Sequence, residues 1–195
     1  PTFNSSNVNS AFDAKEYKAS TMGKHKNGIV AFRRQQVNAL VKAIHSAVKA
    51  TKPNVTFGIS PAGNIDNFTS KYSYYVDINK LLNSHDYVDY ICPQIYWGFK
   101  HPYAKFDRVT KRWMKAAKSK KVKVYIGIAV YRAGHNTGAS SSERREWRSD
   151  ANVLKKQVQY ARKKGCDGFA FFDYQDLKSK TSARAVKNLK KVLKR

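Results

Sequence analysis

The sequence predicts an α/β fold built on a parallel β-sheet. Short apolar runs rich in β-branched and aromatic residues alternate with amphipathic segments whose apolar residues recur at helical spacing. The apolar runs are nearly continuous instead of alternating with polar residues, which is typical of parallel strands that are covered on both faces. With 195 residues, the chain is long enough for one domain with a substantial core.

The first predicted element is a helix that begins near residue 32 and ends before Pro53. Its apolar face is expected to comprise Val37, Leu40, Val41, Ile44 and Val48. Four strand–helix pairs follow, with strands over 54–60, 87–97, 122–131 and 167–174 and helices over 77–86, 106–121, 151–165 and 182–193.

Residues 1–30 are rich in Asn, Ser, Lys and Gly without clear periodicity, and we interpret them as a long loop. Two parts are therefore expected, a loop-rich N-terminal segment over 1–31 and an α/β domain over 32–195. Gly165 is expected to cap the end of the helix that precedes the last strand.

Strands that alternate with helices fit either a doubly wound open sheet or a (β/α)₈ barrel. The dinucleotide fingerprint GxGxxG does not follow any of the predicted strands, and neither does a P-loop. This absence argues against a nucleotide-binding version of the fold, and we expect no cofactor.

Net charge is the outlier of the composition, because 38 Lys and Arg stand against 13 Asp and Glu, giving +25. Such a charge attracts polyanions, so nucleic acid, an anionic wall polymer and a general bias toward basic proteins all compete as explanations. The cations are spread along the predicted helices, as on solvated outer faces, and not gathered in a nucleic-acid-binding module. We therefore favour an anionic wall polymer over nucleic acid.

The cysteines and histidines do not indicate a metal site. Cys92 lies within an apolar strand and Cys166 just before another, which predicts buried thiols more than a disulfide. Neither has a partner at metal-ligand spacing, and the five His residues form no cluster. No run of about 18 apolar residues is present, so we expect no membrane span.

Polar or aromatic residues follow each apolar run, over 59–64, 93–98, 129–134 and 171–176. Ligands of parallel sheets lie at the carboxyl ends of the strands, so we expect these four segments to line one cleft. Flat rings with a polar edge suit the C–H face of a pyranose, and amides and hydroxyls can bind its hydroxyl groups. The candidate sugar-binding residues are Ser60, Asn64, Gln94, Tyr96, Trp97, Tyr131 and Tyr174.

Each aromatic residue has core packing as its alternative. Arg34 and Asn38 share one face of the first helix near its start and are further candidates for substrate binding. Their alternative is a solvent-exposed, charged first turn.

Hydrolysis of a glycosidic bond needs two carboxyl groups, one that donates a proton and one that acts as nucleophile or base. The strand ends supply Asp173, which follows apolar residues and is the candidate general acid. Its alternative role is a hydrogen bond that fixes the neighbouring loop. Asp66 lies further out in a loop, so the acid–base pair is incomplete within these residues.

The segments "FRRQQVNALVKAIHSAVKATKPNVTFGISPAGN", "YVDYICPQIYWGF", "VYIGIAVYRAG" and "GFAFFDYQDL" resemble, in order and spacing, the C-terminal half of the glycosyl-hydrolase-like family 10 domain. The resemblance covers about residues 30–195. It implies the C-terminal half of a (β/α)₈ TIM barrel, with four βα units preceded by one helix. It also implies that Arg34, Asn38, Ser60, Gln94, Tyr96 and Trp97 line a sugar cleft.

The family includes bacterial surface proteins, among them an enzyme that cuts peptidoglycan glycan strands stripped of their peptides. The resemblance therefore implies an extracellular or cell-surface bacterial glycoside hydrolase whose substrate is a glycan. Its acidic strand-end motif is expected upstream of Pro1, with residues 1–30 as the loop that leaves that strand. The family has a small polar residue at the position of Asp173, so this chain departs from it there.

A half-barrel exposes two sheet edges, so we expect a homodimer or complementation by an N-terminal half, and weak activity or none alone. The alternative, from a different class, is a carbohydrate- or wall-polymer-binding module without catalysis.

Overall fold

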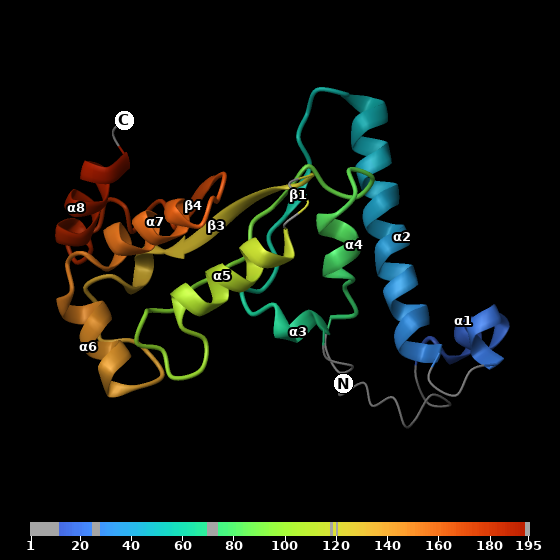
Figure 1. Ribbon diagram of the computed structural model, residues 1–195, viewed down its shortest axis with the longest axis horizontal. Coiled ribbons are helices and arrows are strands. Elements are labelled where there is room, and N and C mark those ends of the chain that lie inside the picture. Colours follow the sequence, from blue (N-terminus) through green and yellow to red (C-terminus); the bar gives the residue numbers. More distant parts are fainter. Residues whose placement is uncertain (1–11, 25–27, 70–73, 118, 120, 194–195) are drawn as a thin grey trace.

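A parallel four-stranded sheet forms the centre of the computed structural model, which describes residues 12–24, 28–69, 74–117, 119 and 121–193 (Figure 1). The strands lie in the order in which they occur in the chain, and each pairs in parallel with the next. Their bounds are β1 Gly58–Ile59, β2 Tyr90–Ile91, β3 Lys123–Ala129 and β4 Gly168–Phe172. The prediction of an α/β protein with four parallel strands is confirmed.

The helices are α1 Ala14–Ala19, α2 Gly28–Thr51, α3 Asp66–Thr69, α4 Ile78–Leu82, α5 Phe106–Ala116, α6 Ser141–Ser149, α7 Val153–Lys163 and α8 Ala183–Leu193, with 3₁₀ turns η2 Thr21–Lys24 and η3 Val130–Arg132. Gly165 follows α7 with φ of 84°, as the predicted helix cap requires. Helix α6 was not predicted.

The expectation of a loop over residues 1–30 is wrong for helix α1 and for the start of α2, while residues 1–11 and 25–27 lie outside the described residues. Tyr17 of α1 packs its ring on Phe32 of α2 at 5.6 Å between ring centroids. Asp13 accepts two hydrogen bonds of 2.8 Å from Arg33. Tertiary contacts thus stabilise a helix too short to be read from the sequence. The division into parts at residue 31 stays a prediction.

Helices α4, α5, α7 and α8 form one continuous layer on a single face of the sheet. Helix α4 packs on α5, α5 on α7, and α7 on α8, while both α5 and α7 contact β3. Successive parallel strands joined by right-handed crossovers produce this arrangement. Val124, Ile126 and Ile128 of β3 are buried on the helical side.

The opposite face of the sheet is only partly covered by described residues. Phe172 of β4 is 53% exposed and Ala170 is also exposed. The expectation that both faces are buried is therefore wrong for β4, because a helix layer on one side leaves the second side to other elements.

Two tyrosines fill the amino-terminal part of this second face. Tyr90 of β2 and Tyr125 of β3 lie 5.2 Å apart between ring centroids. A Cβ on Gly58 would come within 2.5 Å of the Tyr90 ring, and one on Gly168 within 3.0 Å of the Tyr125 ring. Each ring thus occupies the space that a glycine leaves on the adjacent strand.

The predicted apolar face of helix α2 is only partly buried, since Val37, Val41 and Val48 are half-buried. Leu40 is 61% and Ile44 41% exposed, whereas Phe32, Asn38 and His45 are buried. The helix stands near one edge of the molecule (Figure 1). Its apolar periodicity is real, but the described residues cover only part of that face.

The cysteines are free thiols, as predicted, with Cys92 buried and Cys166 half-buried. Burial raises the pKa of both, that of Cys166 to about 11, which makes them poor nucleophiles at neutral pH.

Candidate functional site at the carboxyl edge of the sheet

Ser60 and Gln94 join the ends of β1 and β2. The Ser60 hydroxyl donates to the carbonyl of Cys92 at 2.8 Å, and Gln94 Nε2 donates to the carbonyl of Ser60 at 3.0 Å. Parallel bridges continue beyond the strands, from Ala62 to Gln94 and from Gln94 to Gly127. Gln94 is therefore held in the middle of the sheet, in register with its neighbours on both sides.

Three aromatic rings from three strand ends meet beside this pair. Tyr96 stacks on Phe172, with centroids 5.8 Å apart and planes 19° apart, and meets Tyr131 edge-on at 6.0 Å and 86°. Tyr131 and Phe172 are in turn perpendicular at 6.2 Å. Burial raises the pKa of the Tyr96 hydroxyl, with smaller contributions from Cys92 and Tyr131, so this group remains a neutral donor. Phe172 was missed because an apolar residue at a strand end carries no polar signal.

Trp97 lies against a glycine of the neighbouring strand end. A Cβ on Gly63 would lie 2.2 Å from the carbonyl oxygen of Gln94 and 2.8 Å from the Trp97 ring. The carbonyl of Gly63 accepts a hydrogen bond of 2.6 Å from the buried Trp113 indole. Glycine at position 63 therefore allows the chain after β1 to approach the Gln94 carbonyl and the Trp97 ring closely.

Helices α6 and α7 hold the segment after Trp97 through its backbone. Glu143 accepts from the N–H of Gly98 at 3.0 Å, and Glu146 accepts from the next two N–H groups at 3.2 and 2.9 Å. Gln157 Nε2 donates to the carbonyl of Trp97 at 2.9 Å. The signal that could have revealed α6 is the "SSSE" capping box, since Ser140 accepts from the N–H of Glu143.

The remaining candidates lie around this edge in different settings. Arg34 of α2 reaches the carbonyl of Phe68 at 3.5 Å and so approaches the segment that follows β1, while Asn38 is buried on the same helix. Asn64 accepts from the N–H of its neighbour Asp66 and shapes its own turn. Arg34 and Asn64 therefore both lie next to α3, the short helix that follows β1.

Two candidates follow β4. Tyr174 is exposed, and its ring lies under the ammonium group of Lys178, 4.4 Å from the ring centroid. Asp173 Oδ1 accepts a hydrogen bond of 3.1 Å from the N–H of Asp176, which is the loop-fixing role considered as its alternative. Burial and the neighbouring Asp173 raise the pKa of Asp176. Both carboxylates come from one turn, whereas a glycosidase pair flanks the sugar.

Asp66 is committed elsewhere, because it forms an ion pair with Arg112 of α5. A hydrogen bond from this guanidinium lowers the pKa of the carboxyl, although burial opposes it. Within the described ranges, no group of three or more His, Cys, Asp or Glu is placed to hold a metal ion. In the same residues, no helix has both the length and the apolar character needed to cross a membrane.

The fold and this edge define an α/β protein whose strand ends present aromatic rings, an amide and hydroxyl groups. Residues 2–149 match the family described as Glycosyl hydrolase-like 10, and the chain belongs to that family. The match ends before β4, so Asp173, Tyr174 and Phe172 lie beyond it.

Two curated relatives carry hydrolase names. The chain is 35% identical over 129 residues to "Glycosyl hydrolase YngK" of Bacillus subtilis, an alignment that covers 60% of this chain and 25% of the relative. It is 32% identical over 141 residues to "Glycosyl hydrolase DigH" of Escherichia coli K12, covering 65% of this chain and 31% of the relative. The chain thus spans about a quarter to a third of the length of these relatives.

Proposed function

We propose that this chain is the C-terminal half of the (β/α)₈ barrel of an extracellular bacterial glycoside hydrolase that acts on peptidoglycan-type glycan strands. The family and the hydrolase names of its relatives support the reaction class. The strand order and the one-sided helix layer support the half-barrel, because a barrel needs its helices outside and its second face inside.

The observation that carries the proposal is the cluster at the carboxyl edge. Active sites of barrels lie at this edge, and here Tyr96, Tyr131 and Phe172 meet next to Gln94 and Ser60. Rings provide flat apolar faces for a pyranose, while the amide and hydroxyl groups bind its hydroxyls. The residues proposed to contact sugar are Arg34, Asn38, Ser60, Asn64, Gln94, Tyr96, Trp97, Tyr131 and Tyr174.

Catalysis is proposed to need residues that this chain does not supply. A glycosidase requires two carboxyl groups on either side of the bond, and of the predicted candidates only Asp173 lies at a strand end. The proposed partner is therefore an N-terminal half that carries the acidic pair, or a second copy that covers the open face. The chain alone is expected to bind glycan and to hydrolyse it weakly or not at all.

The test is release of soluble glycan from denuded peptidoglycan by the chain alone, alongside binding of the same strands. We expect binding without appreciable release. Sustained turnover by the chain alone would contradict the half-site proposal, and failure to bind any glycan would contradict the sugar cleft.

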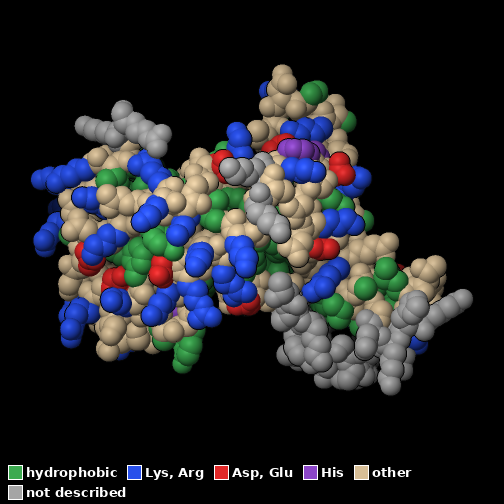
Figure 2. Space-filling view, in the orientation of Figure 1, with side chains coloured by type: hydrophobic (Ala, Val, Ile, Leu, Met, Phe, Trp, Pro, Cys, Tyr) green, Lys and Arg blue, Asp and Glu red, His purple; other side chains and the backbone are tan. Residues whose placement is uncertain are grey.

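A second candidate function is attachment to an anionic wall polymer without catalysis. It is favoured by the net charge of +25 and by the Lys and Arg side chains distributed over the visible face of the molecule (Figure 2). Binding of teichoic acid that exceeds binding of neutral denuded glycan, and that falls steeply with salt, would favour this function.

A further inference from the structure

A cavity of about 720 Å³ that is wide open to solvent lies between helices α6 and α7 and the segment that follows Trp97. Its volume is in the range of small-molecule binding sites, which is about 300–1,000 Å³. It is formed by residues different from the strand-end cluster, and nothing in the family match assigns it a role.

One wall of the cavity is aromatic. Phe99 and Tyr160 are both half-buried, and their rings meet edge-on at 6.3 Å between centroids and 82° between planes. Phe99 is fixed from behind by Phe106, whose ring centroid is 5.4 Å away, and from its backbone by Glu146. Because the two rings are perpendicular, one of them can stack on a sugar ring while the other contacts its edge, at little cost in side-chain entropy.

The rim of the cavity is cationic. Lys100, Arg145 and Lys163 are exposed and line it. Lys156 is neutralised by its ion pair with Asp150 at 2.7 Å. Over the region of α6 and α7, Figure 2 shows Lys and Arg side chains around hydrophobic and acidic ones.

Glu146 is the other acidic group of the cavity, and its oxygens are engaged with the backbone. They accept from the N–H groups of Phe99 and Lys100 at 3.2 and 2.9 Å. The carboxylate thus fixes the backbone of the aromatic wall. Over all the residues that line the cavity, positive charges exceed negative charges by two.

We propose that this cavity binds a pyranose that carries a carboxylate group, as a unit of an anionic glycan. The sugar ring contacts Phe99 and Tyr160, and its carboxylate is held by Arg145 with Lys163 and Lys100 at the rim. A guanidinium suits this task because its parallel N–H groups match the two oxygens of a carboxylate. The site goes beyond the proposed function, because it needs neither the strand-end cluster nor a catalytic pair.

Calorimetric titration of the whole chain tests the site with four probes: trigalacturonate, a tetrasaccharide of alternating N-acetylglucosamine and N-acetylmuramic acid, neutral chitotetraose, and inorganic phosphate. Because chitotetraose is also expected to bind the proposed strand-end cleft, all titrations use the Tyr96→Ala background as well as the parent chain. We expect both carboxylate-bearing sugars to bind in both backgrounds. Whichever of them binds more tightly indicates whether the carboxylate belongs to a uronic acid or to N-acetylmuramic acid. Arg145→Gln is expected to weaken this binding by about tenfold, the effect of losing one hydrogen-bonded charge pair.

The matched control is Arg148→Gln, an exposed arginine of the same helix that does not line this cavity. Tyr160→Ala is a second variant, expected to weaken carboxylate-sugar binding while leaving the weak phosphate binding unchanged.

Equal losses in Arg145→Gln and Arg148→Gln would overturn the proposal, since they would mean diffuse attraction by the basic surface. Phosphate binding as tightly as the acidic sugars, or chitotetraose binding equally in the Tyr96→Ala background, would overturn it too. Absence of chitotetraose binding by the parent chain, with intact acidic-sugar binding, would count against the proposed function alone.

Discussion

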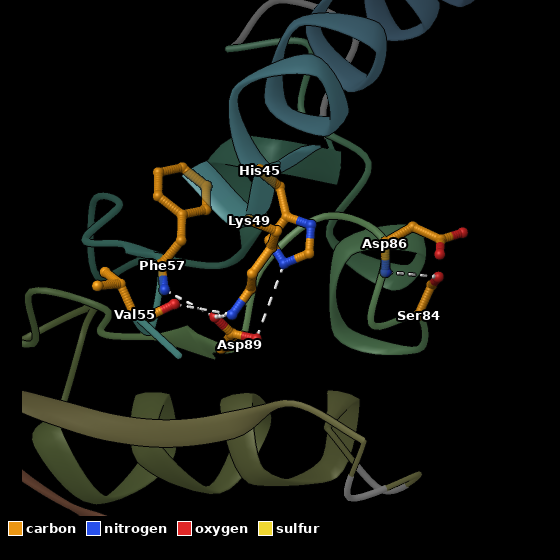
Figure 3. A network of polar contacts seen from close by, with 7 residues as sticks. All are labelled: His45, Lys49, Val55, Phe57, Ser84, Asp86 and Asp89. Carbon is orange, nitrogen blue, oxygen red and sulfur yellow. Dashed lines mark hydrogen bonds and ion pairs between the residues drawn. The ribbon is translucent and has the colours of Figure 1, made fainter. Parts of the chain in front are cut away.

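Lys49 of α2 donates a hydrogen bond of 2.7 Å to the carboxylate of Asp89, which stands one residue before strand β2 (Figure 3). The same ammonium donates to the carbonyl of Val55 at 2.8 Å, and the same carboxylate accepts from the N–H of Phe57 at 2.7 Å. His45 lies on the other side, with Nε2 3.7 Å from Asp89. One ion pair therefore joins the end of α2 to the starts of β1 and β2.

Asp89→Asn is expected to destabilise the chain by about 2 kcal/mol in urea unfolding at pH 7, since it removes a charged acceptor that two donors share. Burial acts to raise the Asp89 pKa, but the hydrogen bonds from Lys49 and Phe57 outweigh it, and the pKa lies below its ordinary value of 3.8. The contribution of a depressed carboxyl pKa is present above pH 3.8 and is lost as the pH falls through the lower folded value. The difference between parent and variant is therefore expected to shrink below pH 3.8.

Asp86→Asn is the matched control for this experiment. Asp86 is exposed and pairs loosely with Lys42 at 3.7 Å, so its replacement is expected to have little effect on the unfolding free energy. Equal effects of the two substitutions would show that Asp89 has no special role.

Gly63→Ala is expected to destabilise the chain by about 2–3 kcal/mol and to weaken glycan binding, because the added methyl group meets the Gln94 carbonyl at 2.2 Å and the Trp97 ring at 2.8 Å. The comparison is Gly165→Ala, where φ is 84° and no atom lies within 4 Å of the new Cβ. That variant is expected to lose only about 1 kcal/mol, with glycan binding unchanged. Unfolding curves measure the stability of both variants, and glycan titrations measure their affinity. An unchanged affinity in a folded Gly63→Ala protein would argue against Trp97 as part of the cleft.

Tyr96→Ala is expected to weaken chitotetraose binding by about tenfold, the loss that one aromatic contact gives. Tyr96 contacts both Tyr131 and Phe172, so its removal opens the centre of the cluster. Tyrosine and tryptophan fluorescence during titration measures the affinity, and circular dichroism verifies the fold. Tyr103→Ala is the control, because that ring is 84% exposed and lies outside the cluster; a similar loss there would contradict the assignment.

Glu146→Gln is expected to change the pH dependence of stability. Burial raises the pKa of Glu146, opposed by the N–H groups of Lys100 and Phe99 and assisted by the charges of Asp150 and Glu143. A raised carboxyl pKa means that the folded state binds a proton above pH 4.5 that the unfolded state has released, so stability falls as the pH rises through this window. The variant lacks this group, and its stability relative to the parent is expected to improve across that window.

Urea midpoints between pH 4 and pH 7 measure this effect. Glu16→Gln, at an exposed position of α1, corrects for the loss of one surface charge. Parallel pH curves for the parent chain and Glu146→Gln would contradict the expectation.

The strand–helix alternation was predictable because each buried strand is an apolar run of its own, as Val124, Ile126 and Ile128 of β3 illustrate. The strand lengths were not, since β1 was expected over 54–60 and is confined to Gly58–Ile59. Val55 is exposed, and β-branched residues there describe an extended segment that has no pairing partner among the described strands.

The candidate site was predictable where residues follow a strand directly. Ser60, Gln94, Tyr96 and Tyr131 meet at the edge because parallel strands end on the same side. The backbone clamp by Glu143 and Glu146 was not predictable, because it joins residues more than 40 positions apart through main-chain groups. The exposure of Leu40 also could not be read from periodicity, which gives the face of a helix but not what covers it.

Tyr90 and Tyr125 cover the amino-terminal part of the open face of the sheet, where their rings fill the space beside Gly58 and Gly168. The contacts that hold these two tyrosines do not involve the aromatic rings and the amide at the carboxyl edge of the sheet. If the carboxyl edge binds sugar as proposed, replacing its strand-end segments would change which sugar is bound and would leave the two tyrosines in place.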